Sequence, residues 1–154
     1  MNEDEFITLL GKTFNDEKVK EFLAACGIKK QPKLGHGDMD AYLENEKKGL
    51  EIVFRDERHL DVKSEEYEEG SLVLWNITMY GDDETFKRFE GNLPLGLKFN
   101  FGLKETKSKL GKKPAWEDSD LGEARWDFKG YCVFITFDEE FKEILNVAVQ
   151  LPVK

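Results

Sequence analysis

The sequence predicts an α+β fold of two tandem modules, residues 1–90 and 91–154, that form one compact unit or one continuous domain. Three observations lead to this prediction. Apolar residues recur at helical spacing near the N-terminus, they alternate with polar residues in later segments, and similar landmarks occur twice in the same order. With 154 residues, of which 40% are hydrophobic, the chain has enough apolar side chains for a core.

Three short helices are expected from apolar spacing and end signals. The first covers Glu3–Leu10 and the second covers Glu17–Cys26, where apolar residues recur at i, i+3, i+4 and i+7. Asn15 or Asp16 can cap the start of the second helix. The third is a basic helix over Lys104–Leu110 that ends at a glycine followed by a proline.

Strands are expected where β-branched and aromatic residues alternate with polar ones. These segments are Ala41–Glu46, Gly49–Arg55, Leu72–Tyr80, Glu123–Phe128, Tyr131–Phe137 and Ile144–Leu151. The segment Trp116–Gly122 is expected to be an acidic loop. In the third strand, simple alternation places Trp75 on the core face with Val73, Ile77 and Met79. The same alternation places Leu74, Asn76, Thr78 and Tyr80 on the opposite face.

The two halves share an order of landmarks. Gly11-x-x-Phe14 and Gly96-x-x-Phe99 each precede a helix, a proline, a loop and a group of strands. The turns Phe54–Glu57 and Phe137–Glu140 also resemble each other. We interpret this as a duplicated α+β module. The alternative is that any two segments with a helix followed by strands look alike.

Charge is distributed unevenly. The net charge of −9 belongs entirely to residues 1–90, whereas residues 91–154 are balanced. Seven acidic residues lie in Asp56–Gly70, and a basic run lies in 98–113. The net sign argues against nucleic acid as the partner, because phosphate binding needs Lys and Arg. The two runs are either solvated faces or a field that attracts a basic protein.

No motif for catalysis, metal binding or a cofactor was found. Cys26 and Cys132 are isolated among apolar residues, so we expect reduced thiols, no metal site and no cofactor. A small hydrolase that works from His36 and loop carboxylates is the alternative, although no nucleophile–base pair is evident. The paired acids of the loops are expected to be solvated turn residues. They are Asp38 and Asp40, Asp82 and Asp83, and Asp118 and Asp120.

The order of helix and antiparallel strands, present twice, resembles the layout of the β-lactamase-inhibitor-protein fold. The segment from Leu93 to Phe99, followed by a short helix and Leu110-Gly111-x-x-Pro114, is also similar to small bacterial immunity proteins of polymorphic and contact-dependent toxin systems. This resemblance implies a non-enzymatic inhibitor that binds a cognate toxin domain, of which a nuclease is one candidate, and blocks it by occlusion. A scaffold module that homodimerises is a further alternative.

The partner is expected to contact the acidic segment and the polar face of the sheet. The predicted binding residues are Glu65, Glu66, Tyr67, Glu68, Glu69, Asn76, Tyr80 and Trp116. Trp116 is either an exposed anchor or a lid on its own module. No apolar run approaches the ~20 residues of a membrane span. Three of the first five residues are acidic, where a signal peptide would be basic and then apolar, so we expect a cytoplasmic protein, monomeric or weakly dimeric when free.

Overall fold

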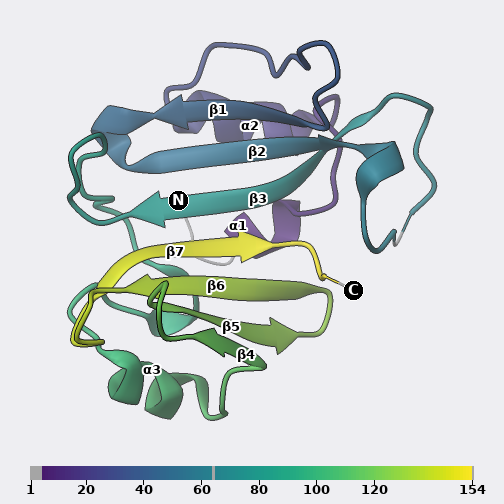
Figure 1. Ribbon diagram of the computed structural model, residues 1–154. Coiled ribbons are helices and arrows are strands. Elements are labelled where there is room, and N and C mark those ends of the chain that lie inside the picture. The colour runs from purple at the N-terminus through teal and green to yellow at the C-terminus, as the bar shows by residue number, and fades with distance from the viewer. Residues whose placement is uncertain (1–4, 64, 154) are drawn as a thin grey trace.

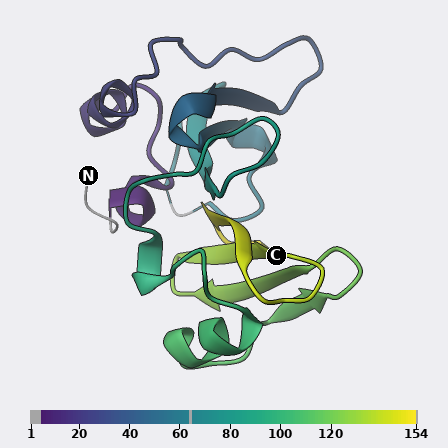
Figure 2. The same ribbon diagram turned by 90° about the vertical axis from the view of Figure 1, so that its left-hand side faces the viewer.

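The computed structural model describes residues 5–63 and 65–153. It shows one seven-stranded antiparallel sheet with helices on a single face, which confirms the predicted α+β class. Figure 1 shows the strands in front and α1 and α2 behind them, and Figure 2 shows α1 and α2 beside the upper strands and α3 below the lower ones. Antiparallel sheets commonly cover one face and leave the other to solvent.

The helices follow the predicted capping signals. The first, α1, covers Glu5–Leu9; the expected Glu3 and Asp4 lie outside the described residues. The second, α2, covers Glu17–Ala25, and Asp16 caps it by accepting a hydrogen bond from the Lys18 amide. The third, α3, covers Leu103–Leu110 and ends at Gly111, whose φ of 71° is readily adopted by glycine.

The strand order in the sheet is β1-β2-β3-β7-β6-β5-β4. The strands are β1 (Asp40–Asn45), β2 (Leu50–Asp56), β3 (Leu72–Tyr80), β4 (Trp116–Asp118), β5 (Glu123–Phe128), β6 (Tyr131–Phe137) and β7 (Ile144–Gln150). Three short 3₁₀ helices lie between them, η1 (Glu46–Lys48), η2 (Glu57–His59) and η3 (Pro94–Gly96). The prediction of a loop over Trp116–Gly122 was wrong at its start, because β4 pairs with β5 there.

A β-bulge in β3 overturns part of the face assignment. Phe54 of β2 lies opposite Leu74, whereas Val53 lies opposite Asn76, so Trp75 is an extra residue in β3. The bulge moves Leu74 into the core, where its side chain is fully buried. Trp75 is only half-buried and stacks against Arg55, so the prediction that Trp75 belongs to the core was wrong.

The main hydrophobic core lies between the helices and the sheet. Phe6 of α1 makes edge-to-face contacts with Phe22 of α2 and with Phe89 of the connection between β3 and α3. Figure 2 shows that this connection, residues 81–102, descends along the helix side of the sheet. Trp126, fully buried in β5, fills the other end of the core. These aromatic side chains are buried on the helix side of the sheet, so the opposite face is not covered by helices.

Candidate functional site

The face of the sheet opposite the helices, called the open face below, is the candidate site. In antiparallel pairs, residues directly opposite each other lie on the same face, so the register defines its members. One row crosses the whole sheet through Glu44, Glu51, Thr78, Ala148, Phe134, Arg125 and Trp116. The centre of this row carries short side chains and its flanks carry long ones, and its two ends lie on the edge strands β1 and β4.

A buried polar network lies at the centre of the open face, where β3 meets β7. Asn76 Nδ2 donates to Gln150 Oε1 at 3.0 Å, and Thr78 Oγ1 donates to Asn76 Oδ1 at 2.8 Å. All three side chains are buried, and no buried polar side-chain atom of the described residues lacks a partner. Asn76 was predicted from the sequence as a contact residue, but its side chain forms hydrogen bonds within the sheet.

Tyr80 lies at the end of β3 and is held by a turn. Asp83 Oδ1 accepts the amides of Thr85 and Phe86, which is typical of an aspartate in a tight turn. The Phe86 ring then stacks on Tyr80 with 4.0 Å between centroids. Burial, with the nearby carboxylate of Glu51, raises the pKa of Tyr80 to about 12, so this hydroxyl stays protonated at neutral pH.

Two acidic residues of the open face lie directly opposite each other. Glu44 of β1 pairs in register with Glu51 of β2, and neither forms an ion pair within residues 5–63 and 65–153. Burial and the charge of Glu44 raise the pKa of the Glu51 carboxyl, despite a hydrogen bond with Tyr80. Like charges opposite each other destabilise a sheet, so this pair is an unfavourable feature of the isolated chain.

Exposed aromatic side chains lie on both edge strands. Tyr42 of β1 is 63% exposed, and Trp116 of β4 is 37% exposed. Trp116 makes an edge contact with Phe134, with 6.4 Å between the ring centroids. The Lys107–Glu117 ion pair links α3 to the short strand that carries this tryptophan. Tyr42 was not predicted as a site residue, because its position on an edge strand follows only from the strand pairing.

Arg55 links Asp40 and Trp75 beside Tyr42 on the open face. Its guanidinium binds the Asp40 carboxylate through two hydrogen bonds of 2.7 and 3.0 Å, and it stacks on Trp75 at 3.5 Å from the ring centroid. Planar guanidinium groups favour such paired contacts. Asp40 is therefore neutralised within the sheet, unlike Glu44.

The acidic segment projects beyond the strand ends at the right of Figure 1. Its first two acids are buried: Asp56 pairs with Arg58 at 2.6 Å, and Glu57 pairs with Lys63 at 2.9 Å. The Arg58 hydrogen bonds hold the pKa of Asp56 at about 2. The predicted acidic contact residues are all exposed; they are Glu65, Glu66, Glu68 and Glu69.

The predicted contact residues do not form one cluster. Tyr67 is half-buried, and its hydroxyl donates to the Gly11 carbonyl at 2.6 Å, which anchors the acidic segment to the body of the protein. Trp116 lies on β4, at the far end of the strand order from β1. Figure 1 shows the acidic segment beside the upper strands and β4 at the opposite end of the sheet. One partner would need a wide surface to contact both.

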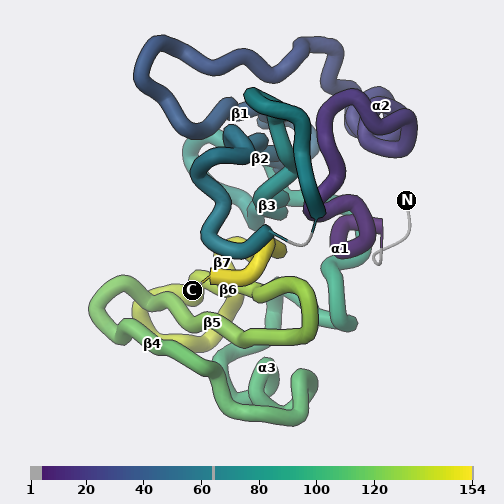
Figure 3. Tube along the Cα trace, turned by 90° about the vertical axis from the view of Figure 1, so that its right-hand side faces the viewer, coloured from purple at the N-terminus to yellow at the C-terminus, as the bar shows by residue number. Residues whose placement is uncertain are grey.

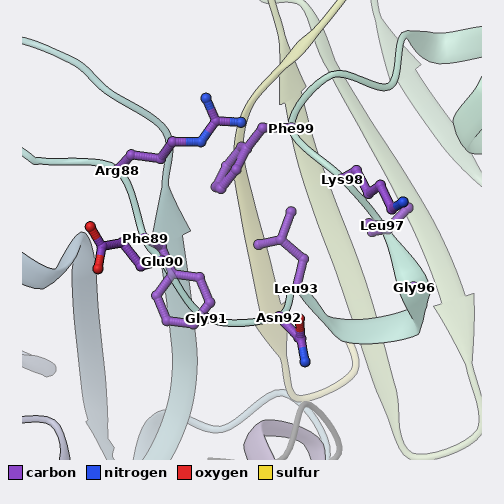
Figure 4. Close-up of a pocket in the computed structure, with 10 residues that line it drawn as sticks. All are labelled: Arg88, Phe89, Glu90, Gly91, Asn92, Leu93, Gly96, Leu97, Lys98 and Phe99. Carbon is purple, nitrogen blue, oxygen red and sulfur yellow. The ribbon is translucent and has the colours of Figure 1, made fainter.

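A hollow of about 590 Å³ lies along the connection between β3 and α3. Figure 4 shows Arg88 reaching toward Phe99 at one end and Leu93 lying between Phe99 and Phe89. The Arg88 guanidinium lies 4.7 Å from the Phe99 ring centroid. No His or Cys lines this hollow, and none of the predicted contact residues does.

The described residues carry no cluster of metal ligands and no membrane-spanning helix. Across 5–63 and 65–153, no three His, Cys, Asp or Glu side chains are placed to share a metal ion. His36 lies exposed in the loop before β1. Burial raises the pKa of the Cys26 thiol to about 12 and that of Cys132 to about 11. Within the same ranges, no helix has the length and apolar character needed to traverse a bilayer.

Comparison with known proteins gave no match to a protein-family model, a curated protein or a solved structure.

Proposed function

We propose that this protein is a non-enzymatic binding protein that holds another protein on its open face. The observation that carries the proposal is the placement of Tyr42 and Trp116 at the two edges of a face that the helices leave uncovered. Exposed aromatic side chains in polar surroundings are typical anchors of protein interfaces. In its specific form, the proposal is an immunity protein that blocks a bacterial toxin domain by occlusion.

The arrangement of the halves supports this specific form. Strands β1–β3 come from residues 1–90 and β4–β7 from residues 91–154, and only the β3–β7 pairing joins the two groups in the sheet. We infer that the halves are duplicated modules, as in the β-lactamase-inhibitor-protein layout. A sheet shared by two modules offers one wide surface, as a single partner needs if it is to contact both Tyr42 and Trp116.

The charge distribution supports a basic partner. The four exposed glutamates of the acidic segment have no ion pair within the described residues. Unpaired exposed carboxylates attract a basic surface over long range and accelerate encounter. A nuclease domain has such a basic surface, because its substrate groove must bind phosphates.

The test is coexpression with the C-terminal domain of the secreted effector that an immunity gene is expected to accompany. We expect the chain to prevent the toxicity of that domain and to form a complex with it. Trp116→Ala and Tyr42→Ala should each raise the dissociation rate by about tenfold or more, as expected for interface anchors. Leu121→Ala is the matched control, since Leu121 is 60% exposed but lies on the β4–β5 turn.

Two outcomes would contradict the proposal. If the neighbouring genes encode no effector, or if the chain neither binds nor protects against the encoded domain, the immunity role is wrong. If a complex forms but both aromatic variants dissociate as slowly as the Leu121→Ala control, the open face is not the binding surface.

A further inference from the structure

Strand β1 has one paired edge and one unpaired edge. The Asp56 amide donates to the Met39 carbonyl at 2.9 Å, just beyond the β1–β2 ladder. Antiparallel ladders alternate hydrogen-bonded and non-hydrogen-bonded pairs, so the bonded pairs fall at Ala41, Leu43 and Asn45. The backbone N–H and C=O groups of the residues between them, Tyr42 and Glu44, therefore point away from the sheet.

These outward groups have no partner in residues 5–63 and 65–153. No backbone hydrogen bond reaches Tyr42 or Glu44 from outside the sheet. Soluble proteins usually protect such an edge by shortening the strand or by placing lysine, proline or a bulge in it. The opposite edge strand, β4, has only three residues, whereas β1 has six, contains no lysine or proline, and pairs with β2 without a bulge.

A groove of about 550 Å³ runs along the unpaired edge. Residues 27–30 form one wall, and Tyr42, Leu43, Glu44 and Glu51 form the other. Figure 3 shows the chain leaving α2, passing beyond β1 and returning to it, so this wall is a separate segment and not a paired strand. The groove gives an incoming extended chain a place beside the outward backbone groups.

Charge selects the occupant. Glu44 and Glu51 form no ion pair in the described residues, and Lys29 and Lys30 of the opposite wall stay unpaired with them, whereas Asp40 is neutralised by Arg55. A chain segment with basic side chains on the open face would relieve the repulsion between Glu44 and Glu51. A second copy of this protein, pairing β1 with β1, would instead bring another Glu44 and Glu51 to the same face. The Glu44–Glu51 side of the groove therefore favours basic side chains of a different protein.

We propose that the unpaired edge of β1 accepts an extended, alternately basic and apolar segment of a partner protein as an eighth strand. Basic side chains would face Glu44 and Glu51, and apolar ones would lie on the side of Leu43, where the groove approaches the buried Ile28. Backbone pairing would supply affinity, and the alternating side chains specificity. This inference deepens the proposed function by naming how the partner is engaged.

The first test measures the outward amides directly. The probe is a blocked seven-residue peptide of the sequence Thr-Lys-Val-Arg-Val-Lys-Thr, added to the ¹⁵N-labelled full chain. We expect hydrogen exchange of the Tyr42 and Glu44 amides to slow by about tenfold near saturation, because both become bonded. A peptide with Glu in place of Lys and Arg should bind more weakly. Absence of binding, or binding with unchanged exchange of both amides, would overturn the proposal.

The second test removes one outward donor. Proline lacks an N–H group and is tolerated on an edge strand where that group faces solvent. Glu44→Pro should weaken peptide binding about tenfold relative to Glu44→Ala, since both variants lose the carboxylate but only proline loses the amide. Thermal denaturation of both variants checks that the fold persists. Equal affinity of two folded variants would overturn the proposal, and the exchange test does not depend on either variant.

Three further results distinguish a partner strand from a second copy of the chain, and strand addition from the proposed immunity role. A concentration-dependent dimer in sedimentation, abolished by Glu44→Pro, would show that a second copy occupies the edge and would overturn the proposal. A toxin domain that binds Glu44→Pro and Glu44→Ala equally would overturn strand addition but leave the binding function intact. Peptide binding with protected amides, without any toxin complex, would support strand addition and contradict only the immunity role.

Discussion

Replacement of Asn76 with alanine should lower the free energy of unfolding by about 2–6 kcal/mol. The change removes two hydrogen bonds, one to Gln150 and one from Thr78. Both partner side chains are less than a tenth exposed, so their polar groups lose protein partners where water has little access. Each buried group left unpaired costs ~1–3 kcal/mol, and the sum gives the expected range.

Thr78→Val is the matched smaller change. It preserves the shape of the side chain and removes only the hydroxyl that donates to Asn76. We expect a loss of about 1 kcal/mol, consistent with one hydrogen bond. Since both variants break the same bond, the double variant should lose less than the sum of the two single losses. Urea denaturation, followed by tryptophan fluorescence and circular dichroism, measures all three values.

The reasoning would be refuted by a small effect. If Asn76→Ala loses less than about 0.5 kcal/mol with an unchanged urea dependence, the hydrogen bonds at the β3–β7 pairing do not stabilise the fold as argued. Strict additivity of Asn76→Ala and Thr78→Val would show that the two side chains act independently. In that case the network would be two separate contacts.

Three other changes test the electrostatics and burial. Glu51→Gln should stabilise the isolated protein by about 0.5 kcal/mol at neutral pH and progressively less toward pH 4. The pKa of the Glu51 carboxyl is raised in the folded state, so ionisation of this carboxyl disfavours folding. Thermal melts between pH 7 and pH 4 measure the difference in stability. Asp56→Asn should destabilise by about 1 kcal/mol at pH 7, a modest value since Arg58 is 61% exposed. Because the folded pKa of Asp56 is lowered to about 2, this loss should fade between pH 4 and pH 2 in urea titrations, and a constant loss would contradict it. Cys26 and Cys132 should react with a thiol reagent about 100-fold more slowly in the native protein than in urea, because both are buried with raised pKa values; equal rates would contradict their burial.

Local patterns were sufficient to predict most of the fold. Helix α2 has a strong apolar period and a capping aspartate, and β3, β5 and β6 are rich in alternating β-branched and aromatic residues, so each element carries its own signal. Strand β4 has no such signal: Trp116, Glu117 and Asp118 are all exposed or half-buried and form a strand only through pairing with β5. A short polar strand of this kind depends on a distant neighbour and is invisible to a local pattern.

The candidate site was harder to predict, because its geometry depends on register. The bulge at Trp75 places Val73 and Leu74 on the faces opposite to those that simple alternation along β3 gives, and Trp75 itself stacks on Arg55 of a neighbouring strand. The exposure of Tyr42 and the position of Glu44 opposite Glu51 likewise follow from the pairing of β1 with β2. Composition indicated the acidic segment, but the burial of Asp56 and Glu57 in ion pairs required the structure.

The position of β7 has a consequence for synthesis. It follows the other six strands in the chain, yet it lies in the middle of the sheet between β3 and β6. A ribosome therefore releases β1–β3 long before the strand that pairs with the free side of β3. Until β7 arrives, the nascent chain carries an unsatisfied strand with Asn76 and Thr78 open to water. Chaperone binding or rapid translation across residues 81–143 would limit the exposure of that edge.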